Sequence, residues 1–205
     1  MAATRKCFDL KVSLIGVDPP IWRAFGIPAD YALDDLHEIL QIVMGWHGYH
    51  SHLFQIKDQL FSSDYDLEGV SRRKLSLSAA FKRSPSGFQY HYDFGDGWRH
   101  EITLLGTQRI PHDDPPPMCW GGEGACPPED VGGVGGFAEF VSALADQNHE
   151  NHAEYLEWIG GGYDPACFSA RQATAGLIAW WRMKEMRDMV VTGLAERMLR
   201  DQPIT

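Results

Sequence analysis

The chain has no apolar run that approaches the ~20 residues of a membrane span. Its first residues, MAATRKCFDLKV, lack the apolar core of a secretory signal. Basic residues are in the minority, with 18 Lys and Arg against 28 Asp and Glu, and the formal net charge is -10. We therefore expect a cytoplasmic protein without a membrane partner, and the charge argues against non-specific binding to nucleic acid.

Cysteine is also scarce. The four cysteines stand at positions 7, 119, 126 and 167, which is no disulfide framework in a chain of 205 residues and is typical of a reduced protein. Cys119 and Cys126 lie in a segment rich in Gly and Pro. Zinc ribbons use tighter Cys-x2-Cys spacing, so a zinc site here would need His112 or other histidines as further ligands. The spacing favours a structural loop.

No complete catalytic motif is present. No serine lies in a G-x-S-x-G string, and the glycines at 132–136 are not followed by the Lys-Ser/Thr of a phosphate-binding loop. Asp93-Phe94-Gly95 matches the magnesium motif of protein kinases, but no HRD segment or Gly-rich nucleotide loop accompanies it. The sequence therefore does not declare a reaction.

The clearest structural signal is the stretch from Phe88 to Leu105. Aromatic residues alternate with polar ones up to Phe94, and a second alternation begins at Trp98. Between them stands the break Gly95-Asp96-Gly97. Period-two alternation on both sides of a Gly-rich break predicts a β-hairpin with one buried face.

The remaining pattern predicts an α+β fold: a mostly antiparallel sheet around the central hairpin, with helices packed on one side. We expect one domain over residues 1–170, and over 171–205 a helical tail that packs on it or pairs with a second copy as a homodimer. The expected strands are 8–17, 21–27 and 53–57. The expected helices are 33–44, 137–144, 150–158 and 170–199, and the first of them is expected to begin at the cap Asp30 and to end at Gly45. Residues 106–136 are expected to form a loop.

A cluster of histidines suggests where chemistry takes place. His47, His50 and His52 are close in sequence, and in a strand His50 and His52 share a face, which would allow them to chelate a divalent metal such as zinc. His100, on the apolar parity of the hairpin, would join them from a neighbouring strand. A half-buried pair of hydrogen-bonded histidines, and a core histidine at position 100, are the alternatives.

The hairpin turn is the second candidate. Asp93 and Asp96 are three residues apart, so their carboxylates suit a divalent cation or an acid–base pair. Aspartate is also a common turn former, and this role leads. The candidate ligand-binding residues are Tyr92, Asp93, Asp96, Trp98 and Arg99.

Several unusual strings, taken together, make the chain resemble the plasmid open-reading-frame-three-like proteins of agropine root-inducing plasmids. The resemblance spans about residues 8–170. It rests on Pro20-Ile21-Trp22-Arg23 with Ile27-Pro28, Leu33-x-x-Leu36-His37 with Met44-Gly45-Trp46, His50-Ser51-His52-Leu53-Phe54, Tyr90 to His100, Ala125-Cys126-Pro127-Pro128-Glu129-Asp130-x-Gly132-Gly133, and Tyr163-Asp164-Pro165 with Phe168. Such proteins often have a further Cys where this chain has Val131, which argues against a three-cysteine metal site.

The resemblance implies an α+β protein of plasmids and insertion elements, without an established activity. We expect a non-enzymatic binding or accessory module. The alternatives are a metal-dependent hydrolase or nuclease that uses His50, His52, Asp93, Asp96 and His100, and an accessory protein that binds nucleic acid.

Overall fold

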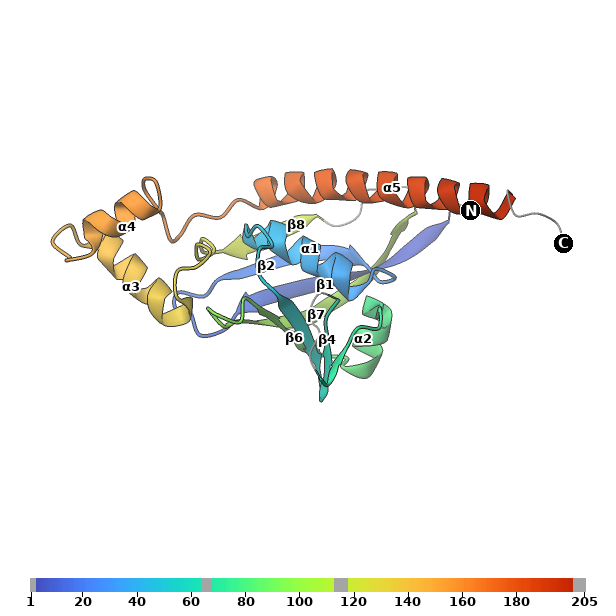
Figure 1. Ribbon diagram of the computed structural model, residues 1–205, viewed down its shortest axis with the longest axis horizontal. Helices are drawn as coiled ribbons and strands as arrows, with labels where there is room; N and C mark the ends of the chain where they lie inside the picture. Colours follow the sequence, from blue (N-terminus) through green and yellow to red (C-terminus); the bar gives the residue numbers. More distant parts are fainter. Residues whose placement is uncertain (1–2, 64–67, 113–117, 201–205) are drawn as a thin grey trace.

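A single mixed sheet organises the chain (Figure 1). The computed structural model describes residues 3–63, 68–112 and 118–200, and for 193–200 the backbone alone. Within them, eight strands lie in the order β5-β4-β3-β6-β7-β1-β2-β8. Every pairing except the parallel β4–β5 contact is antiparallel. The strands are β1 Thr4–Leu14, β2 Trp22–Pro28, β3 His52–Ile56, β4 Gln59–Phe61, β5 Val70–Ser71, β6 Gly87–Tyr92, β7 Trp98–Pro111 and β8 Cys119–Glu123.

The predicted hairpin is confirmed and lies at the centre of the sheet. Its strands β6 and β7 pair from Gly87 opposite Thr103 to Tyr92 opposite Trp98. Tyr90, Tyr92 and Trp98 are fully buried, as the alternation predicts. The connection that follows Tyr92 therefore lies at one end of the sheet, beside the segment that enters β3, because His52 pairs with Tyr92.

The described residues also form five helices, and the predicted α+β class is confirmed. They are α1 Leu33–Met44, α2 Leu77–Arg83, α3 Gly133–Ala145, α4 His152–Trp158 and α5 Ala170–Arg200. The apolar stripe of α1 is buried against the sheet, and the helix ends at Gly45, whose φ of 97° is the left-handed conformation that glycine adopts without strain. The expected cap Asp30 is wrong: Ala32 is the capping residue, and its N–H donates to the Asp35 carboxylate at 2.9 Å.

The prediction of a loop over residues 106–136 is wrong where β7 and β8 lie. β7 continues to Pro111 because it pairs with β1 on both sides of a register shift at Asp9/Leu10. β8 adds an edge strand against β2. These partners are distant in sequence, so local composition could not reveal them, and residues 113–117 of the predicted loop lie outside the described part of the chain.

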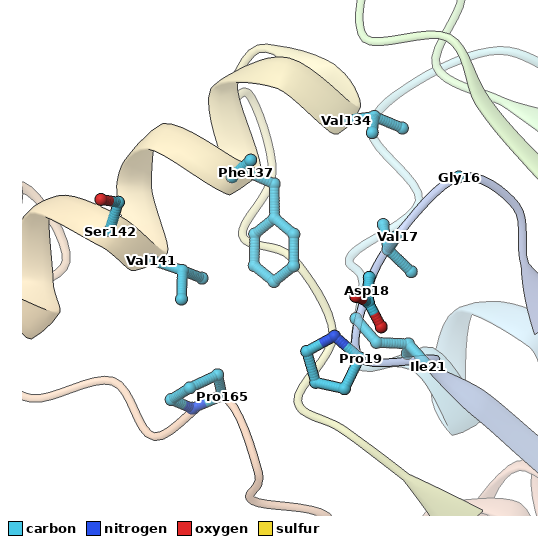
Figure 2. A pocket seen from close by; sticks show the side chains of 11 residues that line it. Gly16, Val17, Asp18, Pro19, Ile21, Val134, Phe137, Val141, Ser142 and Pro165 are labelled. Carbon is cyan, nitrogen blue, oxygen red and sulfur yellow. The ribbon is translucent and has the colours of Figure 1, made fainter.

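The α3–α4 pair lies at one end of the molecule, and α5 extends toward the other end (Figure 1). α5 begins over β8 and α1, which bury its residues Ala173, Leu177 and Trp180, and its final turns extend past the sheet. α3 and α4 form a hairpin at the opposite end. A cavity of about 250 Å³ lies between α3 and the β1–β2 connection (Figure 2). No helix among the described residues combines the length and apolarity that crossing a bilayer requires.

Candidate functional site

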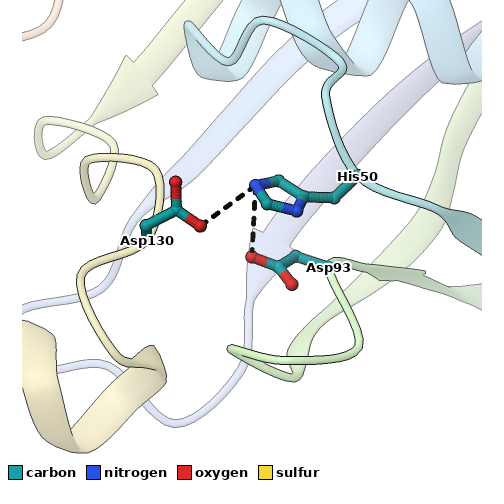
Figure 3. A group of neighbouring side chains, drawn as sticks. All are labelled: His50, Asp93 and Asp130. Carbon is teal, nitrogen blue, oxygen red and sulfur yellow. Dashed lines mark ion pairs between the residues drawn. The ribbon is translucent and has the colours of Figure 1, made fainter.

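Three connecting segments meet at the end of the central hairpin (Figure 3). His50 comes from the segment before β3, Asp93 from the turn after β6, and Glu129 and Asp130 from the segment before α3. The antiparallel pairing of β3 with β6 brings His50 and Asp93 to one edge. The third segment is attached through the Trp46 indole, whose Nε1–H donates to the Pro127 carbonyl at 3.0 Å.

One imidazole nitrogen faces three carboxylates. Nε2 of His50 lies 3.3 Å from Oδ1 of Asp130, 3.6 Å from Oδ2 of Asp93 and 3.7 Å from Oε2 of Glu129. Both Nε2 of His50 and Oε2 of Glu129 are buried and have no hydrogen-bond partner among the described residues. A buried nitrogen and a buried carboxylate oxygen without a partner are costly, so a positive charge between them would stabilise the arrangement.

Asp93 is held in place by its other oxygen. Oδ1 accepts hydrogen bonds from the backbone N–H groups of Gly95 at 2.9 Å and Asp96 at 3.3 Å. These bonds direct Oδ2 toward His50. The backbone of Asp93 is left-handed with φ of 54°, a conformation that aspartate tolerates better than most residues. The side chain is only 7% exposed, so its position is fixed by the turn.

Glu129 is oriented in the same way. Its Oε1 accepts hydrogen bonds from the Tyr92 hydroxyl at 3.0 Å and from the His47 backbone N–H at 2.9 Å, which leaves Oε2 for His50. Burial and the neighbouring Glu129 carboxylate raise the pKa of Tyr92, so its hydroxyl stays protonated and remains a donor. Asp130 differs, because its side chain is 72% exposed and its φ is 60°.

Three of these groups, His50, Asp93 and Asp130, lie as the ligands of one metal ion would. Imidazole and carboxylate ligands bind zinc-like ions at about 2.0 to 2.2 Å, which separates neighbouring donors by roughly 3.0 Å in an octahedron and 3.4 Å in a tetrahedron. The separations of 3.3, 3.6 and 3.7 Å around Nε2 are close to these edges. The donor atoms of His50, Asp93 and Asp130 all lie within 4.8 Å of one another. A small contraction would therefore bring them to bonding distance of one cation.

The structure places the other predicted metal ligands elsewhere. His52 is 3% exposed and stacks on His37, with ring centroids 3.6 Å apart and planes 3° apart. His50 lies before the strand rather than in it, so the two histidines do not share a strand face as predicted. His100 is fully buried under Trp46, and its Nδ1 lies 3.3 Å from the Tyr90 carbonyl. Burial lowers the pKa of His100 to about 3, so this imidazole is neutral.

The predicted ligand-binding residues also separate. Tyr92 supports Glu129 and Asp93 faces His50, as described above. Asp96 accepts a hydrogen bond from the Gly132 N–H at 3.2 Å, at the start of α3. Trp98 is fully buried, whereas Arg99 is exposed and lies opposite His91, on the other face of the sheet.

Sequence reasoning missed Glu129 and Asp130 as site residues. Both residues belong to the Pro-Pro-Glu-Asp string at 127–130, which no local pattern connects to the histidines. The signal that could have found them is an acidic pair between two prolines and two glycines, where a short connection fixes the backbone. Their proximity to His50 depends on the three-dimensional fold.

The fold and the site define an α+β protein with a His and carboxylate cluster at the end of a central hairpin. Residues 6–172 match the family model of the plasmid pRiA4b ORF-3-like proteins, and the chain belongs to this family. It is 41% identical over 192 residues to the uncharacterized protein y4hQ of Sinorhizobium fredii, a match that covers 87% of this chain and 95% of the relative. A solved structure, the protein of unknown function MM3350 from Methanosarcina mazei Go1, has a TM-score of 0.75 and 32% identity. That match covers 82% of this chain and 97% of the solved chain.

Proposed function

We propose that the protein binds a divalent metal ion through His50, Asp93 and Asp130, with the Glu129 carboxylate beside His50 as a further ligand or a supporting charge. The observation that carries this proposal is the buried Nε2 of His50, which has no hydrogen-bond partner among the described residues and faces three carboxylates. A neutral imidazole presents a lone pair to a metal, while carboxylates that face such a lone pair without a cation repel it.

The donor set indicates the class of metal. One imidazole nitrogen with two or three carboxylate oxygens suits Mn²⁺, Fe²⁺ or Zn²⁺ better than Cu⁺, which prefers thiolates, or Mg²⁺, which favours oxygen and retains its water. Cys119 and Cys126 lie outside this cluster, and burial raises the pKa of each thiol. A neutral thiol is a poor metal ligand.

The site also favours a second candidate function, metal-dependent hydrolysis. Asp130 is exposed, so a bound ion would be open to solvent on that side. A metal with an open coordination position lowers the pKa of bound water and generates a nucleophile, while a structural site is closed by protein ligands. A non-enzymatic metal-binding module remains the leading proposal, because the cluster offers metal ligands and the sequence contains no complete catalytic motif.

Isothermal titration tests metal binding directly. The chain, purified without a histidine tag and treated with a chelator, is titrated with Mn²⁺ and then with Zn²⁺. We expect one ion per chain and a higher melting temperature with metal, because ligand binding to the folded state stabilises it by about 2.7 kcal/mol at a hundredfold excess over Kd. The absence of any heat or thermal shift with both ions contradicts the proposal.

The control is His50→Ala, compared with His112→Ala outside the cluster. Loss of binding in the first variant alone assigns the ion to the site. Hydrolysis is examined separately with the metal-loaded protein and an activated phosphodiester. Turnover that disappears in His50→Ala supports the second candidate, and binding without turnover leaves the metal-binding module.

A further inference from the structure

The exposed part of α5 has an apolar stripe. Met183, Met186 and Val190 are 55%, 63% and 60% exposed. They follow each other at spacings of three and four residues, which places them on one side of the helix. We call these three residues the α5 stripe. Exposed methionines and valines in a row are typical of a helix that docks into an apolar groove.

The stripe does not face its own sheet. Ala173, Leu177 and Trp180, on another side of α5, are the residues buried there. Lys184 then binds Asp35 of α1 at 2.9 Å, and Arg187 binds Glu38 at 3.2 Å. These contacts fix the rotation of α5, so the stripe stays exposed in the isolated chain.

An apolar cavity at the other end of the molecule matches this stripe. It lies between α3 and the β1–β2 connection, and Figure 2 shows apolar side chains on both sides. Val17 and Ile21 form one wall, and Val134, Phe137 and Val141 form the other. The volume of about 250 Å³ suits side chains of methionine size. Leu156 and Trp158 of the adjoining α4 are also exposed, at 41% and 47%.

The two surfaces are complementary in charge. Residues 130–165, which contain α3 and α4, include seven Asp and Glu and no Lys or Arg. Residues 170–200, which form α5, include six Lys and Arg against three Asp and Glu, and two of the six, Lys184 and Arg187, already bind carboxylates of α1. Complementary potentials steer association and select the partner. An acidic surface with an apolar cavity thus fits a basic helix with an apolar stripe.

We infer that two copies of this chain form a dimer in which the α5 stripe of each copy occupies the α3 cavity of the other. Within one chain the stripe and the cavity lie toward opposite ends (Figure 1), so a copy cannot fill its own cavity. In a two-fold dimer both stripes and both cavities are buried at the same time, so the assembly closes at two copies. This inference is independent of the metal site.

Analytical ultracentrifugation of the full chain tests the dimer. The stripe variant is Met183→Glu with Met186→Glu, and the cavity variant is Val141→Glu, with Val17→Ser as a second cavity variant in case the first does not fold. The matched control is Thr192→Glu, an exposed position on another side of α5. We expect dimers for the wild type and the control, and monomers for the stripe and cavity variants.

Mixing distinguishes this dimer from one in which α5 pairs with α5. The stripe variant retains its cavity, and the cavity variant retains its stripe, so an equimolar mixture regains one of the two contacts and forms mixed dimers. Raising the salt from about 0.05 to 0.5 M should weaken the wild-type dimer severalfold, since the charges are then screened. A monomeric wild type, a cavity variant that still dimerises, or a mixture that stays monomeric would overturn the inference.

Discussion

At the scale of single residues, the site depends on carboxylates whose two oxygens have different tasks. In Asp93, Oδ1 accepts hydrogen bonds from two backbone N–H groups and thereby stabilises the turn, and Oδ2 faces His50. In Glu129, Oε1 accepts from Tyr92 and His47, and Oε2 faces the same nitrogen. Supporting hydrogen bonds of this kind orient metal ligands before the ion arrives.

Asp93→Asn separates these two tasks. Asparagine tolerates the left-handed backbone and retains an oxygen for the turn, but it replaces Oδ2 by an uncharged amide nitrogen. We expect the variant to fold and its Kd for Mn²⁺ to rise by about 100-fold, a loss typical when a metal site is disturbed. Asp96→Asn is the control, because Asp96 contacts Gly132 instead of His50, and its Kd should change by less than about threefold. An equal rise of the Kd in both variants would contradict a direct role of Asp93 Oδ2 in metal binding.

His100 makes stability depend on pH. Burial lowers its folded-state pKa to about 3, whereas an unfolded histidine has a pKa of about 6.5. Between these values the unfolded chain binds more protons, so the free energy of unfolding decreases as the pH falls from 6.5 toward 3. His100→Asn keeps an N–H near the Tyr90 carbonyl and removes the titration. From pH 6.5 to 4.5, urea denaturation should show that the wild type loses about 2 kcal/mol more than the variant. Equal losses would mean that His100 accepts a proton in the folded state.

At the scale of elements, close backbone contacts hold the segments of the site together. Gly133, at the start of α3, has φ of 68°, and a Cβ there would stand 2.3 Å from the Asp96 carbonyl oxygen. α3 can therefore approach the Asp93–Gly97 turn only with glycine at this position. This contact fixes the relation of Asp130, which precedes the helix, to Asp93.

Gly133→Ala and Gly135→Ala form a matched pair of helix substitutions. The first places a Cβ against a carbonyl oxygen at positive φ, and we expect it to destabilise the protein by about 2 kcal/mol or more. The second meets no atom within 4 Å, so alanine should stabilise α3 by about 0.5 to 1 kcal/mol. Chemical denaturation measures both. A tolerated Gly133→Ala would show that α3 does not need this close contact.

Elements were easier to predict than contacts. The period-two pattern of Phe88–Leu105 predicted the hairpin, and the spacing of Leu33, Leu36 and Leu40 predicted α1, because each pattern is local. β8 and the second half of β7 were missed because they are strands only through pairing with β2 and β1. For the site, the sequence singled out His50 and Asp93, but it grouped them with His52 and His100. Alternation along a strand cannot show which histidine lies beyond its end.

At the scale of the whole molecule, the chain belongs to the plasmid pRiA4b ORF-3-like family. The match to the plasmid pRiA4b ORF-3-like proteins ends at residue 172, so nearly all of α5 lies beyond it. The three segments of the proposed metal site lie within it. A bound ion would connect segments around positions 50, 93 and 130, which are far apart in sequence, and would thereby stabilise that end of the sheet.

Anomalous diffraction from crystals of the protein loaded with Mn²⁺ or Zn²⁺ tests the central claim most directly. We predict one peak at about 2.0 to 2.3 Å from His50 Nε2, with carboxylate oxygens of Asp93 and at least one of Glu129 and Asp130 at similar distances. A map without a peak between these residues, with His50 Nε2 instead donating a hydrogen bond to a carboxylate, would contradict the account.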